Sequence, residues 1–214
     1  MSDVASFQPY LDELVAFATP EARKDELVAA RKQFFEVTGE IFEDDKQFEA
    51  RMSSLLEFFL FDRPREEGLT PAAELYGRVL KEGPPERAAA FRAFTETVHG
   101  LFEVRKLGKG WVMLRELFTG LDFQVTERRQ LAGLTRGDVL EARLIPFGGH
   151  FWFSAAFCWH PRNAVASILK EVKRRKKKGA ALPAEFLADC ARRSLKADRY
   201  RNIAIEKIYE FDAS

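Results

Sequence analysis

A cysteine and two histidines in one aromatic-rich stretch have side chains that commonly bind metals. Cys158 and His160 are separated by one residue, and His150 lies ten positions before His160. Zinc usually takes four protein ligands, or three and a water, from closely spaced pairs. The alternative interpretation is a buried cysteine beside histidines that end a strand. Because the sequence has no second close pair, we expect no metal and no cofactor.

The same residues, and three carboxylates, are of types that can take part in catalysis. A nucleophilic Cys158 with His160 as its base requires a third group that orients the base, and none is evident. Asp44, Asp45 and Asp62 are candidates for acid–base or magnesium chemistry. However, helix N-termini favour acidic residues through the helix dipole, and Asp62 precedes an arginine in a predicted turn. The sequence therefore predicts structural roles for these carboxylates and no catalytic residue.

A run of six consecutive positive charges is the strongest functional signal in the sequence. It follows an apolar helical stripe that stops where the run begins, so we expect its side chains to have little to bury. Such a run is either a solvated helix end or a contact surface for an acidic partner. We expect a partner-binding surface formed by Lys173, Arg174, Arg175, Lys176, Lys177, Lys178, Arg192 and Arg193.

The overall charge hides a gradient along the chain. The 34 basic and 33 acidic residues give a net charge of +1. Residues 1–70 contain 8 basic and 16 acidic residues, whereas residues 161–214 contain 14 basic and 7 acidic residues. An acidic head and a basic tail can bind each other, a second copy of the chain or separate partners.

The first hundred residues predict five helices joined by short connections. Apolar residues recur at the helical spacing, and Thr19-Pro20 and Thr70-Pro71 are typical helix starts. The third helix ends in the apolar run 58–61, which we expect to be deeply buried. We expect the fifth helix to continue to Gly100.

After residue 100 the apolar period changes to that of strands. Five β-rich runs are separated by turns that contain glycine, at residues 102–107, 111–117, 121–127, 138–147 and 150–160. They predict a five-stranded antiparallel meander that forms a small barrel or a curled sheet. Helical patterns return after Pro161.

The last predicted strand has two different faces. One face is expected to be core and holds Phe151, Phe153, Ala155, Phe157 and Trp159. The other face is mixed and holds His150, Trp152, Ser154, Ala156, Cys158 and His160. It can meet the helical layer, solvent or a ligand.

These patterns together predict an α+β fold in three segments. Residues 1–100 form an N-terminal helical layer, residues 101–160 form a small antiparallel β-barrel packed on it, and residues 161–214 form basic C-terminal helices.

The middle of the chain resembles a domain of uncharacterised bacterial proteins that often accompanies the zinc-binding SEC-C motif. The similar segments are LLEFFLFDRPREEGLTPAAELYGRVL, LFEVRKLGKGWVMLRELFTGLDFQVTE and LTRGDVLEARLIPFGGHFWFS. They cover roughly residues 45–160, and the paired cysteines of SEC-C itself are absent. The resemblance implies a shared fold and transfers no catalytic residue.

The leading functional hypothesis is a cytoplasmic, non-enzymatic adaptor or regulator that binds an acidic protein surface through its basic C-terminal helices. Two cysteines cannot form a disulfide framework, and residues 1–5 do not begin a signal peptide. The apolar run 55–61 is too short to span a membrane, and we expect no membrane partner. The alternative is a nucleic-acid-binding protein that uses the same charges and exposed barrel aromatics. An enzyme of an unrecognised kind is the third hypothesis.

Overall fold

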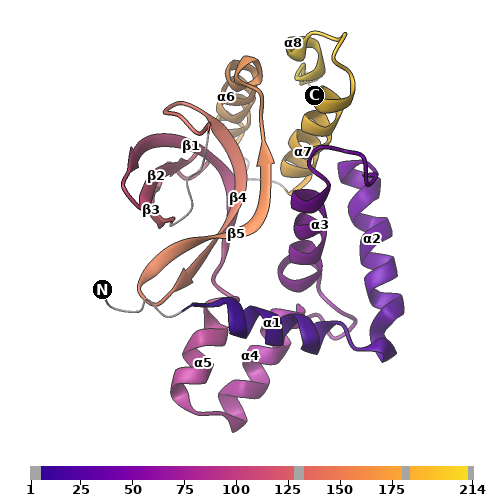
Figure 1. Ribbon diagram of the computed structural model, residues 1–214, viewed down its shortest axis with the longest axis vertical. Helices are drawn as coiled ribbons and strands as arrows, with labels where there is room; N and C mark the ends of the chain where they lie inside the picture. The colour runs from indigo at the N-terminus through magenta and orange to yellow at the C-terminus, as the bar shows by residue number, and fades with distance from the viewer. Residues whose placement is uncertain (1–5, 128–132, 180–183, 212–214) are drawn as a thin grey trace.

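The computed structural model describes residues 6–127, 133–179 and 184–211. Five helices form its N-terminal layer (Figure 1). They are α1 (Gln8–Ala18), α2 (Lys24–Thr38), α3 (Phe48–Glu57), α4 (Pro71–Glu82) and α5 (Pro85–Arg92), with a 3₁₀ turn, η1 (Glu21–Arg23), before α2. The predicted extension of the fifth helix to Gly100 is wrong, because β1 already begins at Val98. Val98 pairs there with Leu144, and β-branched residues favour such pairing.

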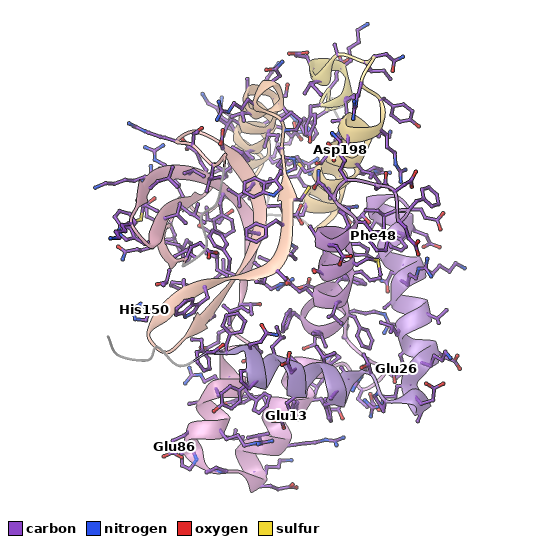
Figure 2. The ribbon with its side chains drawn as sticks, viewed as in Figure 1. Glu13, Glu26, Phe48, Glu86, His150 and Asp198 are labelled. Carbon is purple, nitrogen blue, oxygen red and sulfur yellow. The ribbon has the colours of Figure 1, made fainter. Side chains whose placement is uncertain are left out.

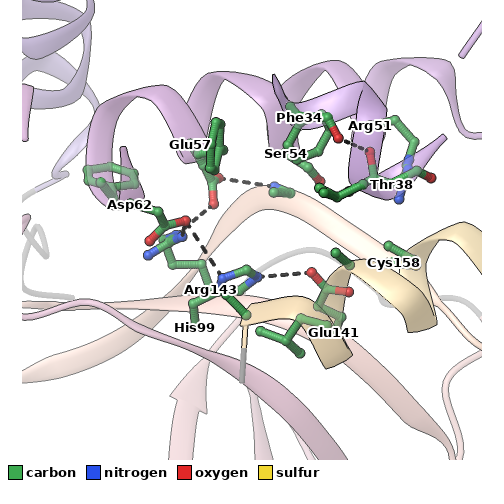
Figure 3. A pocket seen from close by; sticks show the side chains of 18 of the residues that line it. Phe34, Thr38, Arg51, Ser54, Glu57, Asp62, His99, Glu141, Arg143 and Cys158 are labelled. Carbon is green, nitrogen blue, oxygen red and sulfur yellow. Dashed lines mark hydrogen bonds and ion pairs between the residues drawn. The ribbon is translucent and has the colours of Figure 1, made fainter. Parts of the chain in front are cut away.

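The last turn of the third helix departs from α-helical geometry. Residues Phe58–Asp62 form a π-helical segment, η2, in which the Arg63 amide donates a hydrogen bond to the Phe58 carbonyl. Phe59 and Leu60 are buried, as the apolar run predicts. In an α-helix, residues five positions apart point about 140° apart, whereas the wider π-turn brings them closer to one face. Glu57 and Asp62 are five positions apart and both face the barrel (Figure 3).

The five predicted strands form a closed barrel, but their order is not a meander. The strands are β1 (Val98–Gly108), β2 (Trp111–Glu116), β3 (Asp122–Thr126), β4 (Val139–Phe147) and β5 (His150–Trp159). They follow the order β1-β2-β3-β5-β4, and β4 pairs with β1 to close the barrel. Because β3 and β5 pair in parallel, the sheet is mixed and the predicted all-antiparallel pairing is wrong. The sequence identifies each hairpin but contains no local signal for the strand that closes the barrel.

The two faces of β5 separate largely as expected. Phe153 and Phe157 are buried inside the barrel with Phe102, Leu114 and Leu140. Trp159 is 37% exposed, so the expectation that it belongs to the core is wrong. Ala155 is exposed as well.

A β-bulge between the last two strands explains why the alternation fails there. Ala142 pairs with Phe157 and Leu144 pairs with Phe153, so β5 has extra residues between these pairs. The extra residues bend the strand and turn Ala155 outward. Ser154 and Ala156, on either side of it, are buried beneath the helices.

Three helices follow the barrel. They are α6 (Arg162–Lys177), α7 (Ala184–Arg199) and α8 (Ile205–Ile208), and they form a separate apolar cluster with Leu101, Phe118 and Val139. In Figure 1, α7 stands beside α2 and α3 on the side of the barrel where β5 lies. No helix within the described ranges is both long enough and apolar enough to span a bilayer.

One contact joins the acidic first third of the chain to its basic end. Arg199 of α7 donates a hydrogen bond through Nε to Asp45 at 2.8 Å and another through Nη2 to the Glu40 carbonyl at 2.8 Å. The hydrogen bond from Arg199 lowers the pKa of Asp45. Acidic residues of the first third therefore pair in part with basic residues of the C-terminal helices of the same chain, and Asp45 has a structural role.

Candidate functional site

The outer face of β4 and β5 is covered by α3, η2 and α7 and carries several ionisable residues. Glu141 on β4 pairs directly with Cys158 on β5, and His99 on β1 pairs with Arg143 on β4. Side chains that alternate on a strand share a face, so His160 lies next to Cys158 on this surface. The mixed face of β5 thus meets the helical layer, which is one of the three expected possibilities.

Arg143 is the centre of a buried ion-pair network. Its side chain is 4% exposed, and its Nε lies 3.1 Å from an oxygen of Glu57. Its Nη2 contacts Asp62 (Figure 3). Its Nη1 donates to the Thr97 hydroxyl at 2.9 Å. The other oxygen of Glu57 accepts a hydrogen bond from the Ala156 amide at 3.3 Å. Burial raises the pKa of Glu57, and the positive charge of Arg143 opposes that rise.

His99 extends this network to Glu141. Its Nε2 lies 3.0 Å from an oxygen of Glu141, and its Nδ1 lies 3.8 Å from Asp62. Burial by itself raises the pKa of Glu141, but the hydrogen bond to His99 and the nearby positive charges bring it below its ordinary value. Glu57, Arg143, Asp62, His99 and Glu141 therefore form one continuous chain of contacts between helices and barrel.

Arg51 on α3 is the charge in this region that lacks an ionic partner. The residue is 2% exposed, and its Nη2 donates to the Thr38 carbonyl at 3.0 Å. Its buried Nε has no hydrogen-bond partner. No carboxylate of the described residues lies within 4.0 Å of its guanidinium group. A buried charge without an ion-pair partner is unfavourable, so an anionic ligand in contact with Arg51 would be stabilised.

A cavity of about 600 Å³ lies between the helices and the barrel at this network (Figure 3). Arg51, Glu57, Asp62, His99, Glu141 and Arg143 contribute its polar wall. Aromatic and aliphatic side chains from α2, η2 and α7 form the rest, among them Phe34, Phe58, Phe61 and Leu187. A hollow of this size, with a few convergent polar groups, is typical of small-molecule sites.

Three potential metal ligands meet at the edge of the cavity. The carboxylate of Glu141, the sulfur of Cys158 and a ring nitrogen of His160 lie within 4.8 Å of one another. Burial raises the pKa of the Cys158 thiol to about 12 and lowers the pKa of His160 to about 4. Without a metal, the thiol is therefore protonated and the imidazole is neutral at pH 7.

His150 does not join this group. It lies at the turn between β4 and β5, at the opposite end of the strand from His160, and is exposed (Figure 2). Cys158 and His160 therefore lie together, as the sequence suggested, but the third residue of the group is Glu141 and not His150. Cross-strand pairing supplies this ligand, and the spacing along the sequence could not indicate it.

The predicted basic surface divides into exposed lysines and arginines that pair within the molecule. Arg174 and Arg175 both bind Glu171, which is 4% exposed, with nitrogen–oxygen distances of 2.7 and 2.6 Å. The Arg175 guanidinium also lies over the ring of Phe186. These two arginines thus have more to bury than the sequence suggested. Within the basic run, the exposed side chains are those of Lys173, Lys176, Lys177 and Lys178, and Lys176 donates a hydrogen bond to the Leu117 carbonyl at 3.3 Å.

The two predicted arginines of α7 also differ from each other. Arg193 binds Asp189 at 2.9 Å and donates to the Ile208 and Glu210 carbonyls, so it holds the C-terminal segment in place. Arg192 is exposed and lies 3.6 Å from Asp189. The predicted surface is therefore not one continuous set of free charges.

The cavity residues were missed because each one occurs in an otherwise apolar pattern. Glu57 stands inside the run 55–61, and Arg143 stands between Ala142 and Leu144 in a strand. A lone charge at a position expected to be buried is the signal that identifies such residues. Arg51 gives a similar signal, because it occupies the buried face of α3 with Leu55.

Comparison with known proteins identifies one family. The sequences grouped as DUF7986, a family of unknown function, match residues 20–182. The matched region extends beyond the resemblance over residues 45–160 in both directions. No curated protein and no solved structure matches the chain. The match does not connect the family to SEC-C motifs, so that part of the resemblance stays a prediction.

Proposed function

The chain belongs to DUF7986, a family of unknown function, and we propose that it is a binding protein for a small molecule with an anionic group and an apolar body. The ligand occupies the cavity between α3, α7 and the barrel. The observation that carries this proposal is the buried Arg51, which lacks an ionic partner and lines that cavity.

The charges around Arg51 explain why the ligand is anionic. Glu57 and Asp62 share Arg143 as their cationic partner, and one oxygen of Glu141 is bonded to His99. Arg51 donates to the Thr38 carbonyl and lies over the Phe34 ring, and no carboxylate of the described residues is in direct contact with it. A carboxylate or a similar anion forms charge-assisted hydrogen bonds with a guanidinium group, and these are stronger than neutral ones.

The remaining walls select an apolar body. Phe34, Phe58 and Phe61 offer aromatic surface, and Leu187 and Ala188 offer aliphatic surface from the opposite helix. Cavities of roughly 300–1,000 Å³ with mostly apolar walls enclose small organic ligands. The expected class is therefore an aliphatic or aromatic carboxylic acid of moderate size.

Binding is favoured over catalysis by the state of the reactive groups. The Cys158 thiol has a pKa of about 12 because it is buried, so it is a poor nucleophile at neutral pH. His99, Glu57 and Asp62 are already engaged with one another through Arg143 or directly. The network is suited to holding α3 and η2 against the barrel.

Binding of octanoate and 2-naphthoate, measured by calorimetry and thermal unfolding, tests the proposal. Their amides, octanamide and 2-naphthamide, are matched neutral probes. We expect the carboxylates to bind and raise the melting temperature, and the amides to bind weakly. Arg51→Met should weaken carboxylate binding about 10- to 100-fold, since a hydrogen bond to a charged group contributes roughly 1.5–3 kcal/mol.

Two further variants distinguish a loss of binding from a loss of folding. Arg31→Met removes an exposed arginine of α2 outside the cavity and should bind as the wild type does. Ala188→Phe fills the cavity from α7, keeps Arg51 and should also abolish binding. Equal binding of acids and amides, or normal binding by a folded Arg51→Met variant, would refute the proposal.

A second candidate function, contact with an acidic protein surface, is favoured by the surroundings of the exposed lysines. Lys173, Lys176 and Lys177 surround a shallow hollow lined by Leu117, Leu169 and Val172. An apolar centre with a charged rim is common at protein–protein interfaces. Nucleic acid would instead place its phosphates against the lysines and arginines and its bases against exposed barrel aromatics.

Replacing Lys173, Lys177 and Lys178 together with serine tests this second function. Retention of partners from a lysate of the native cells should fall for the variant and should survive nuclease treatment. Binding of generic duplex DNA with a steep dependence on salt would favour the nucleic-acid alternative. Unchanged retention by the variant would show that these lysines are a solvated helix end.

A further inference from the structure

We propose that Glu141, Cys158 and His160 form a binding site for a zinc ion at the wall of the cavity. The site goes beyond the proposed ligand binding and does not depend on it. Carboxylate oxygen, thiolate sulfur and imidazole nitrogen are the three atom types that zinc binds in proteins, and three protein ligands leave a fourth position open. Such a mixed set suits zinc better than magnesium or calcium, which prefer oxygen ligands alone.

The β4–β5 ladder places the three side chains on one face. Glu141 and Cys158 are directly opposite each other in the antiparallel pairing, and His160 follows Cys158 by two positions. Directly opposed residues on one face have β-carbons about 4.5–5.5 Å apart. Their ligand atoms lie within 4.8 Å of one another, which is close to the roughly 3.3–3.8 Å spacing around a tetrahedral zinc ion. Small side-chain rotations are enough to close the difference.

The hydrogen bonds around the site leave two of the required atoms, on Glu141 and His160, without partners. Glu141 has one oxygen bonded to His99, while its other oxygen is buried and unpartnered. His160 is 7% exposed; its Nδ1 lies 3.0 Å from the Tyr209 hydroxyl, and its Nε2 is buried and unpartnered. Metal-bound histidines usually have their second nitrogen fixed by such an outer partner. His99 and Tyr209 therefore act as positioning residues for the two ligands.

The charge balance of the site also accommodates zinc. On binding, the Cys158 thiol releases its proton to solvent and the sulfur binds the ion as a thiolate. The two negative charges of this thiolate and the Glu141 carboxylate then balance the two positive charges of zinc. Because the thiol is protonated before binding, the net charge of the three ligands together with the ion changes from −1 to zero.

Metal binding by the full chain, first stripped with a chelator, tests the proposal. Zinc and cobalt(II) are titrated separately in competition with a chromophoric chelator. We expect one ion per chain, and the cobalt form should show a sulfur-to-metal charge-transfer band and intense visible bands of four-coordinate cobalt. The spectrum of the wild-type protein identifies thiolate ligation even where a variant fails to fold.

Matched variants then assign the ligands. Cys158→Ser should remove the charge-transfer band, and His160→Gln should abolish tight binding. Tyr209→Phe and His99→Gln should weaken binding about 10- to 100-fold, as loss of an outer partner does. Cys190→Ser is the control, because Cys190 is the other buried cysteine and is not part of the group.

Two results would overturn the proposal. The first is a wild-type protein that binds neither ion in competition with the chelator, in which case buried water satisfies the unpartnered atoms. The second is binding that persists in folded Cys158→Ser and His160→Gln variants, which would mark an adventitious surface ion. Carboxylate binding is measured separately with chelated protein, so failure of either proposal leaves the other intact.

Discussion

Buried charges at single positions connect the helical layer to the barrel. Arg143 belongs to β4 and Glu57 to α3, so their ion pair crosses the interface between these elements. Removing one partner of a buried pair leaves the other charge uncompensated, which is more costly than loss of an exposed pair. The network is therefore expected to contribute strongly to stability and to the shape of the cavity.

Arg143→Met should destabilise the protein by about 3–5 kcal/mol, since Glu57 and Asp62 would lose their buried partner. Unfolding in urea, monitored by circular dichroism, measures this change. Arg115→Met is the matched control on β2, where Arg115 binds the exposed Asp122. That exposed pair is screened by solvent and should contribute far less to stability. Similar losses in both variants would show that burial of the Arg143 network adds nothing.

At the scale of single residues, the sequence predicted the barrel interior better than the site. Phe153 and Phe157 follow the alternation of a strand and are buried as predicted. Cys158 and His160 were singled out from the sequence, but their neighbour Glu141 was not. Contacts of this kind depend on strand register, and those to α3 depend on tertiary packing. Neither has a local sequence pattern.

Helix α6 shows how one element uses a run of like charges. Its final turns carry Arg174 and Arg175, which converge on the buried Glu171, whereas the lysines point to solvent. Positive side chains at a helix C-terminus also interact favourably with its dipole. The six charges therefore divide into a structural pair and a set of four lysines.

Replacing Arg174 and Arg175 together with glutamine should lower the melting temperature, because Glu171 would remain buried without a cation. Replacing Lys176 and Lys177 with glutamine should leave the melting temperature nearly unchanged or raise it slightly, because fewer positive charges would repel one another along the run. Thermal unfolding of both double variants measures the difference. An equal response of the two pairs would contradict the division between structural arginines and exposed lysines.

The same element should give an acid-sensitive contribution to stability. A hydrogen bond from Arg174 lowers the pKa of Glu171 from its ordinary value of 4.5. Burial raises this pKa in part, and a second hydrogen bond, from Arg175, lowers it further. A carboxyl group with a lowered folded-state pKa stabilises the protein above pH 4.5, and this contribution is lost as the pH falls through the lowered value. Glu171→Gln should therefore be less stable than the wild type at neutral pH, and the difference should shrink in acid. Urea unfolding from neutral to acidic pH measures it, and a constant difference would contradict the assignment.

Elements were predicted more reliably than their arrangement. The five strands and the hairpin at Gly148-Gly149 follow from local turn chemistry, and both glycines have the positive φ that a type I′ turn requires. The parallel contact between β3 and β5 joins distant segments and has no such signal. The π-turn also has no local sequence signal. It lets both Glu57 and Asp62 contact Arg143 of the barrel, and that contact depends on tertiary packing.

At the scale of the whole molecule, three apolar clusters are joined to one another through residues of the barrel strands. The helical cluster includes Ile145 and Phe147 of β4, and the C-terminal cluster includes Leu101 of β1. Barrel strands thus contribute to all three clusters, so the three predicted segments should unfold together. Sharing of this kind favours a single cooperative transition.

The positions of the tryptophans make this cooperativity measurable. All three of them, Trp111, Trp152 and Trp159, lie in barrel strands, whereas far-ultraviolet circular dichroism reports mainly on the helices. Urea transitions followed by fluorescence and by circular dichroism should coincide. A separate fluorescence transition would show that the barrel unfolds independently of the helices.

Ligand binding in the cavity is the central claim, and methyl NMR during titration with 2-naphthoate tests it most directly. We expect one saturable set of shift changes at cavity methyl groups, those of Val37, Ala142, Leu187, Ala188 and Ala191. The exposed Val28, Leu80 and Leu121 serve as surface controls and should not respond. The changes should disappear in Arg51→Met. Shifts confined to the surface controls or to Leu169 beside the lysines, or no saturable shift at all, would contradict the account.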